Sequence, residues 1–490
     1  MSREVLRDTI IYLPSKVIPG LVGVAAVPIL TSLLPPEQYG QYLLAMTTLS
    51  LIVAFCISWL VSTIIRFNVI CSIETLFQQT RRMLTFSILL ACILWLVAAQ
   101  LLGETFRSQL FIVAGLVWLI AYGGFEYFSG WLRGRNLAKA YSLAMSWRSV
   151  VGLLCVVTLL NLGFRDGPIV LLGFAAAMFL GLFFLPRYAL KTDSNQIKLD
   201  ESKSNLGILL RYGIPVAISN LFTVGLSVVD RFIINIYFGA ESVAIYGANY
   251  DLGEKTIFFV NSLLLLSSSV IGFRIFERDG GAKAAEFLAR IMRLYLLVAS
   301  PLVVAIAVLS PNIVMVLLPE EYHAGAFVLP IVAVGGLIVG VLHRYSLVLS
   351  FNRRTDMIMW CTACALAVNI GACIFLIPRY GILGAAFGTI FAYTSWLVFV
   401  RLAASNYLAP RFPWPTLIRV CVAALISAAA MYSIIYQNFT NNLFTFAFSS
   451  LFGFISYFVA LILLNEITKK EVKLISSIAS ARFEKIRNHF

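Results

Sequence analysis

The chain has 490 residues, of which 60% are hydrophobic and only 12% are charged. Soluble globular proteins carry about twice that share of charged residues, and a membrane-spanning helix needs about 20 largely apolar residues in succession. Such runs fill most of the sequence, which excludes a soluble protein and predicts an all-α protein that crosses a membrane many times.

About fourteen transmembrane helices are predicted. They cover residues 9–33, 41–63, 83–102, 109–129, 144–162, 167–187, 208–235, 248–272, 294–311, 324–347, 357–377, 382–402, 417–437 and 442–464. The Lys and Arg residues that lie outside these helices gather at one set of helix ends, and only Arg107, Arg165 and Arg379 lie at the other. Because Lys and Arg are enriched in cytoplasmic loops, both termini are predicted to be cytoplasmic. The net charge of +14 then reflects topology and attraction to anionic lipids rather than nucleic-acid binding.

The predicted helices fall into two related halves. Residues 1–187 form an N-lobe of six helices, 188–206 a polar cytoplasmic linker, and 207–404 a C-lobe of six more. Tyr39-Gly40 and Tyr246-Gly247 occupy matching places in the two halves, which predicts a repeat about an axis along the membrane normal. Residues 405–464 add a hairpin of two helices. Residues 465–490 form a basic tail, either an amphipathic helix on the membrane surface or a solvated segment.

Charged side chains inside the predicted helices indicate where function resides, since each costs about 2.5–3.5 kcal/mol if it faces lipid at the bilayer centre. Asp230 and Arg231 lie in the seventh helix, and Asp251, Glu254 and Lys255 share one face of the eighth. We expect them to form one cluster between the two helices. The cluster is either a structural ion network or, through its three acids, a gate or ion-coupling site.

Lys16 lies in the first predicted helix, which contains no acid after Asp8. Pro14 and Pro19 are expected to loosen that helix, and a cation without a local partner there predicts an anion-binding cavity. A lysine that reaches for the membrane surface is the alternative. Three arginines at cytoplasmic helix ends are candidates for a positive entrance to the cavity, with simple topological bias as the alternative. They are Arg66, Arg148 and Arg344.

Several catalytic classes lack their signature residues in this sequence. The chain has no Walker A motif for ATP, and its three His residues lie apart, at 323, 343 and 489. Cys361 and Cys364 form a C-x-x-C within a predicted helix, where small-residue packing explains them better than metal binding. The sequence predicts a carrier rather than an enzyme, with neither a cofactor nor a metal.

Three stretches carry a family resemblance: "PILTSLLPPEQYGQYLLAMTTL" (28–49), "VVDRFIINIYFGAESVAIYGANYDLGEK" (228–255) and "LIPRYGILGAAFGT" (376–389). They resemble Wzx-like polysaccharide flippases of the MOP superfamily. The resemblance implies two six-helix lobes around a central cavity that opens alternately to either side. It also implies that the cargo is an undecaprenyl-pyrophosphate-linked oligosaccharide, a repeat unit of O-antigen, capsule or exopolysaccharide, moved to the outer leaflet of the bacterial inner membrane.

A pyrophosphate requires cations in the cavity, so the resemblance makes Lys16, Arg231 and Lys255 the candidate ligands. Asp230 would hold or release Arg231, and Asp230, Asp251 or Glu254 would couple transport to protons, sodium or the membrane potential. The implied partners are the glycan lipid, membrane lipids and other glycan-assembly membrane proteins. The alternatives are a lipid II flippase, a cation-coupled multidrug antiporter of the same superfamily, and a non-transporting scaffold or polymerase subunit.

Overall fold

The computed structural model describes residues 13–68, 73–189, 206–437 and 443–466. All regular structure in these ranges is helical. Most of the predicted linker and the basic tail from residue 467 lie outside the described residues, so the expectation of an amphipathic tail helix stays a prediction.

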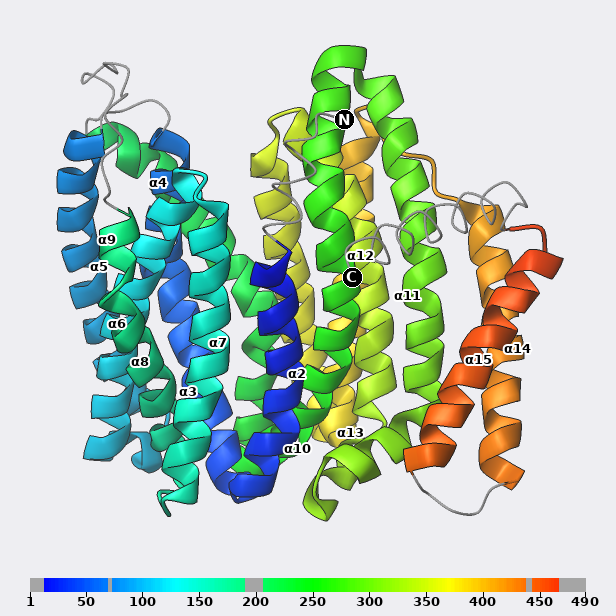
Figure 1. Cartoon of the computed structure of the whole chain (residues 1–490), viewed down its shortest axis with the longest axis horizontal. Coiled ribbons are helices and arrows are strands. Elements are labelled where there is room, and N and C mark those ends of the chain that lie inside the picture. The colour runs from blue at the N-terminus through cyan, green and yellow to red at the C-terminus, as the bar shows by residue number, and fades with distance from the viewer. Residues whose placement is uncertain (1–12, 69–72, 190–205, 438–442, 467–490) are drawn as a thin grey trace, which may run out of the picture.

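The N-lobe and the C-lobe stand side by side, with the helical hairpin at the outer edge of the C-lobe (Figure 1). The N-lobe consists of α2 (Pro14–Leu33), α3 (Pro36–Cys56), α4 (Ser58–Phe67), α5 (Ile73–Leu101), η1 (Glu104–Arg107), α6 (Gln109–Gly134), α7 (Ala138–Asn161), α8 (Gly167–Leu182) and α9 (Leu185–Ala189). The C-lobe consists of α10 (Leu206–Asp279), α11 (Gly281–Leu317), η3 (Glu320–Gly325), α12 (Val328–Phe351) and α13 (Thr355–Ser405). The hairpin consists of α14 (Trp414–Gln437) and α15 (Leu443–Leu463).

Two of the longest helices are broken by a glycine with left-handed backbone. Gly239 (φ 77°) divides α10 and Gly381 (φ 58°) divides α13, and each helix folds back on itself there. A positive φ is readily adopted only by glycine. Ten described helices are long and apolar enough to cross a membrane, and α8 and residues 447–463 add two shorter apolar ones. With the two breaks, these segments correspond one for one to the predicted helices.

Two local expectations from the sequence were wrong. The predicted loop at 236–247 is helical on both sides of Gly239, so the turn needs almost no connecting residues. The predicted loosening around Pro19 is not observed, because α2 continues unbroken from Pro14 to Leu33 with Pro19 and Pro28 inside it. Proline is tolerated in membrane helices where neighbouring groups satisfy the freed backbone.

The side of the molecule that carries the break at Gly239 is called here the far side, and the side where α9 ends and α10 begins is the linker side. The lobes contact each other near the start of α10, where Gly213 lies against Trp59, and also on the far side. A Cβ atom placed on Gly40 of the N-lobe would lie only 1.9 Å from the carbonyl oxygen of Ala240. A Cβ atom on Gly247 of the C-lobe would lie 2.4 Å from Leu43. Gly40 and Gly247, the glycines of the two Tyr-Gly pairs, therefore each lie closely against the opposite lobe.

The hairpin is attached to the C-lobe through α11. Arg293 of α11 and Arg419 of α14 both bond the carboxylate of Glu466, which follows α15 and is only 3% exposed. Tyr457 of α15 also donates a hydrogen bond to the carbonyl oxygen of Leu297 on α11 (3.3 Å). The hairpin is thereby fixed to one lobe.

Candidate functional site

A cavity of about 630 Å³ lies between the lobes in the linker-side half of the molecule. Its walls come from α2, α6 and α7 of the N-lobe and from the second part of α10 in the C-lobe. The charged residues that line it are Lys16, Arg148, Lys255 and Glu126. Three cations against one acid make this an electropositive site.

The cations in the cavity differ in how they are neutralised. Arg148 of α7 forms an ion pair with Glu126 of α6. Lys16 belongs to the first turn of α2, and among the described residues no hydrogen bond or ion pair involves its side chain. The single acid in the lining is thus engaged by Arg148, and Lys16 retains an unpaired charge toward the cavity.

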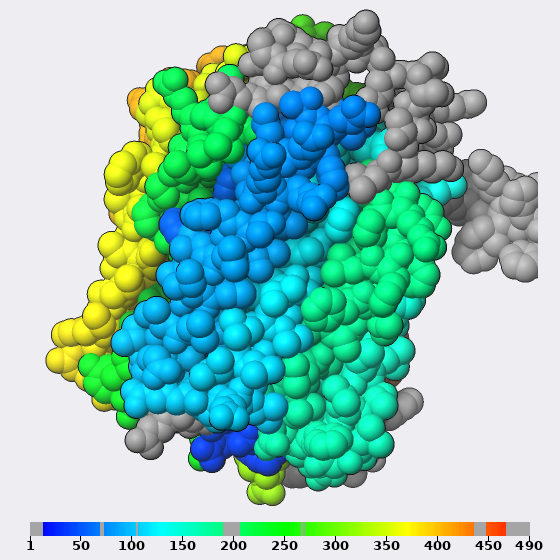
Figure 2. All heavy atoms as spheres, turned by 90° about the vertical axis from the view of Figure 1, so that its left-hand side faces the viewer, coloured from blue at the N-terminus to red at the C-terminus, as the bar shows by residue number. Residues whose placement is uncertain are grey.

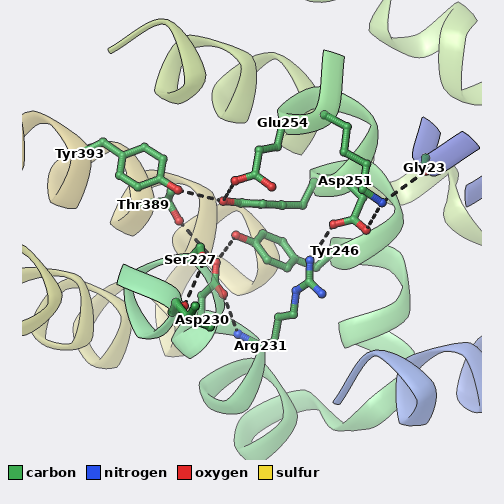
Figure 3. Close-up of polar contacts among 12 residues, drawn as sticks. Gly23, Ser227, Asp230, Arg231, Tyr246, Asp251, Glu254, Thr389 and Tyr393 are labelled. Carbon is green, nitrogen blue, oxygen red and sulfur yellow. Dashed lines mark hydrogen bonds and ion pairs between the residues drawn. The ribbon is translucent and has the colours of Figure 1, made fainter. Parts of the chain in front are cut away.

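Lys255 lines the cavity and also pairs with Asp251, a member of the ion network inside the C-lobe that Figure 3 shows. Its ammonium group donates to Asp251 (2.9 Å) on α10 and to the carbonyl oxygen of Gly23 (3.3 Å) on α2, so it bridges the two lobes. Asp251 also accepts from the guanidinium group of Arg231 (2.7 Å). One carboxylate therefore neutralises two cations that lie on opposite sides of the break at Gly239.

The other two acids of the cluster are held by hydroxyl groups. Asp230 accepts from the backbone N–H of Arg231 (2.8 Å) and from Tyr246 (2.5 Å), and Glu254 accepts from Tyr250 (3.2 Å). The hydroxyl of Tyr250 also lies 3.2 Å from that of Tyr393 on α13. The expected contact between the Asp230 carboxylate and the Arg231 guanidinium group is absent, because the arginine side chain turns to Asp251.

Three of the predicted site arginines lie elsewhere. Arg231 is 8% exposed and does not line the cavity, so it does not contact a ligand there in this conformation. Arg66 stacks on Tyr212 of the C-lobe, 4.4 Å from the ring centre. Arg344 is fully buried and donates to Asn261 and to the carbonyl oxygen of Gly340, so it forms no part of a cytoplasmic entrance surface.

Sequence reasoning missed the tyrosines of the cluster. Tyr246, Tyr250 and Glu254 repeat at intervals of four residues on one helix face, a signal that could have indicated their contacts. Thr389 and Tyr393 approach from α13, which no local pattern reveals. In the part of the chain that the structure describes, no group of His, Cys, Asp and Glu side chains could hold a metal ion.

Several solved structures of membrane transporters share this arrangement of helices. An inward closed conformation of the lipid II flippase MurJ superposes with a TM-score of 0.70 and 16% identity, covering 93% of this chain and 99% of that one. An inward-facing multidrug resistance MATE transporter gives 0.62 and 15%, covering 81% and 97%. A transporter from Pyrococcus furiosus, described as having a binding pocket of reverse polarity, gives 0.56 and 15%, covering 82% and 95%. Two of these structures are described as MOP-superfamily transporters, and the fold of this chain is the one that all three share.

The sequence itself gives a narrower assignment. Residues 5–268, more than half of the chain, match the family of polysaccharide biosynthesis proteins. None of the curated proteins matches the chain. The chain belongs to the polysaccharide biosynthesis protein family, and it has the fold of multi-pass membrane transporters. The resemblance to polysaccharide flippases of the MOP superfamily is thereby confirmed.

Proposed function

We propose that this protein moves an undecaprenyl-pyrophosphate-linked oligosaccharide across the bacterial inner membrane by alternating access. The observation that carries the proposal is the inter-lobe cavity in which Lys16, Arg148 and Lys255 face a single acid. Charge-assisted bonds to phosphate oxygens are short and strong, and a pyrophosphate carries enough negative charge to engage several cations at once. Membership of the polysaccharide biosynthesis family supports a glycan as the cargo.

The paired state of each cation assigns it a role. Lys16 is the first ligand of the pyrophosphate, since no described residue pairs with its charge. Lys255 is the second, because the substrate can compete with Asp251 and with the backbone of α2 for its ammonium group. Arg148 is the third, if the substrate displaces Glu126. Arg231 acts behind them, by holding Asp251 in place.

If both termini are cytoplasmic, as the Lys and Arg distribution indicates, the contacts at Gly40 and Gly247 close the outer side of the molecule. Trp59 against Gly213 and Arg66 against Tyr212 also join the lobes on the cytoplasmic side, so the cavity would receive its substrate from the inner leaflet once these contacts open. Asp230, Asp251 and Glu254 lie in one network with the cavity lysine 255, which is where protons, sodium or the membrane potential would act on the cycle. Moving one charge through 100 mV supplies about 2.3 kcal/mol.

A lipid II flippase is the second candidate, and the superposition with MurJ over nearly the whole of both chains favours it. Lipid II presents the same pyrophosphate to the cavity and differs in its glycan. A multidrug antiporter fits less well, because a cationic drug would meet three cations and an acid that is already paired.

The test is lipid analysis in cells from which the gene has been depleted. We expect mass spectrometry to detect an accumulated polyprenyl-pyrophosphate oligosaccharide whose mass identifies the glycan. Wild-type protein should clear it, and Lys16→Gln combined with Lys255→Gln should not. Lys283→Gln, which removes an exposed lysine paired loosely with Asp279 (3.7 Å), is the matched control. Accumulation of lipid II instead would favour the second candidate, and an unchanged lipid pool with increased retention of cationic dyes would refute both.

A further inference from the structure

A second hollow lies at another seam between the lobes and shares no lining residue with the cavity described above. Its volume is about 890 Å³, within the range of ligand pockets (about 300–1,000 Å³). The N-lobe contributes parts of α3, α4 and α5, and the C-lobe contributes the first part of α10. Figure 2 looks onto this face of the N-lobe, where α5 crosses the centre and α10 begins beside its upper end. We call this hollow the seam groove.

The seam groove has a polar end and an apolar end. On α5, Thr75, Gln79 and Arg82 line it nearest the linker side, and Met83 and Phe86 follow on the same helix face. On α10, an apolar stripe of Leu206, Leu210, Ile214 and Ala217 faces them. Phe86 is 67% exposed and Ile214 is 55% exposed. The lining thus has the polarity of an amphiphile, with a cationic head region and a long apolar region.

The charge at the polar end has no protein partner among the described residues. Arg82 is exposed, and among the described residues no ion pair or hydrogen bond involves its guanidinium group. The linker side carries most of the Lys and Arg outside the helices, which places this end at the cytoplasmic leaflet. Anionic phospholipids gather in that leaflet, and basic pockets between helices on the cytoplasmic side bind their head groups.

We propose that the seam groove binds one anionic phospholipid, with its phosphate at Arg82 and an acyl chain between α5 and α10. The positive charge of Arg82 favours a lipid that brings its own phosphate to the groove. The polyprenyl chain of the cargo would bring none, because its pyrophosphate occupies the cavity. The lobes touch beside the groove, where a Cβ atom on Gly213 would lie 2.2 Å from Trp59 and where Arg66 stacks on Tyr212. A lipid that contacts both lobes there stabilises this arrangement of the two lobes.

The experiment measures lipid binding to the purified full-length protein in neutral detergent by native mass spectrometry. The probes are dioleoyl phosphatidylglycerol, dioleoyl phosphatidylcholine and undecaprenyl phosphate. We expect one phosphatidylglycerol to bind in preference to phosphatidylcholine. Arg82→Gln should raise its Kd about fivefold, the equivalent of ~1 kcal/mol for one cation near a lipid head group. Ile214→Trp, which fills the groove from an exposed position, should also weaken binding.

Arg81→Gln is the matched control, because Arg81 is the exposed neighbour of Arg82 and does not line the groove. An equal loss of affinity in Arg81→Gln, or equal binding of phosphatidylcholine, would refute a defined lipid site. Tighter binding of undecaprenyl phosphate than of phosphatidylglycerol would overturn the proposed occupant in favour of the polyprenyl carrier. The measurement needs no glycan lipid, so its result is independent of the proposed cargo.

Discussion

Replacing Gly40 by alanine tests whether the far-side contact between the lobes is part of the transport cycle. The added Cβ atom would lie 1.9 Å from the carbonyl oxygen of Ala240 and 2.6 Å from its carbon. Both are backbone atoms in the opposite lobe, so no side-chain rotation relieves the clash and the lobes must part. Overpacking of this kind costs about 1–3 kcal/mol. A state in which the lobes are already apart on the far side escapes that cost, so its population relative to the closed state should rise about 5- to 150-fold.

The assay is a distance measurement by electron paramagnetic resonance across the far side, in a background without native cysteines. Labels at Arg165 of the N-lobe and Glu320 of the C-lobe are suitable, because both residues are exposed and lie on that side. Gly40→Ala should transfer intensity from the short to the long distance. Gly371→Ala is the control, since a Cβ atom on Gly371 meets nothing within 4 Å. Unchanged distances in a well-folded Gly40→Ala protein would show that the contact does not govern the equilibrium between the two states.

Two further predictions concern the ion networks. Asp251→Asn leaves Arg231 and Lys255 without their shared acid, so thermal unfolding in detergent should show that the unfolding free energy falls by about 3 kcal/mol. Adding Arg231→Gln should restore part of this stability. An unchanged Tm with abolished transport would identify a gate rather than a structural network. Burial alone would raise the pKa of Glu466, but hydrogen bonds from Arg293, Arg419 and Thr416 outweigh it and lower that pKa. The stabilisation is therefore present above pH ~4.3, the pKa of an unfolded glutamate, and is lost as the pH falls through the lower folded value. Glu466→Gln should lower the unfolding free energy by about 3 kcal/mol at pH 7 and make stability less sensitive to acid. The control is Asp356→Asn, in an exposed pair with Arg354, which should change the unfolding free energy by less than ~1 kcal/mol. Equal effects of the two substitutions would contradict a stabilising role for the ion pairs at Glu466.

The membrane-spanning helices and the ion cluster could be predicted because their signals are local. Apolar runs mark the helices, and Asp251 and Lys255 share a face through their spacing of four residues. The first and second parts of α10 are consecutive and antiparallel, so Arg231 on the first part could be expected to lie near the face that carries Asp251 and Lys255. The sequence did not predict which acid would form an ion pair with Arg231. Asp230 is adjacent to it in sequence but points elsewhere, and its carboxylate is already occupied by Tyr246 and a backbone N–H.

The cavity itself depends on packing between helices that are distant in sequence. Lys16, Glu126 and Arg148 come from three helices of the N-lobe, and no repeat or spacing relates them. Arg344 was expected at a cytoplasmic entrance to the cavity, but the structure buries it. Its place near a helix end resembles that of a topological marker, yet neighbouring helices enclose it fully, and Tyr295 lies under its guanidinium group at 4.6 Å. Side-chain burial of this kind follows from tertiary contacts rather than from position along a helix.

The attachment of the hairpin at Glu466 has a consequence for how the molecule moves. Because Arg293 of α11 and Arg419 of α14 share that carboxylate, α14 and α15 would move together with the C-lobe in the proposed alternating-access cycle. The two moving bodies would then be unequal in size, because the C-lobe with its hairpin is larger than the N-lobe. Any protein or surface that binds the hairpin would hold the C-lobe in place, so that the N-lobe would be the part that rotates.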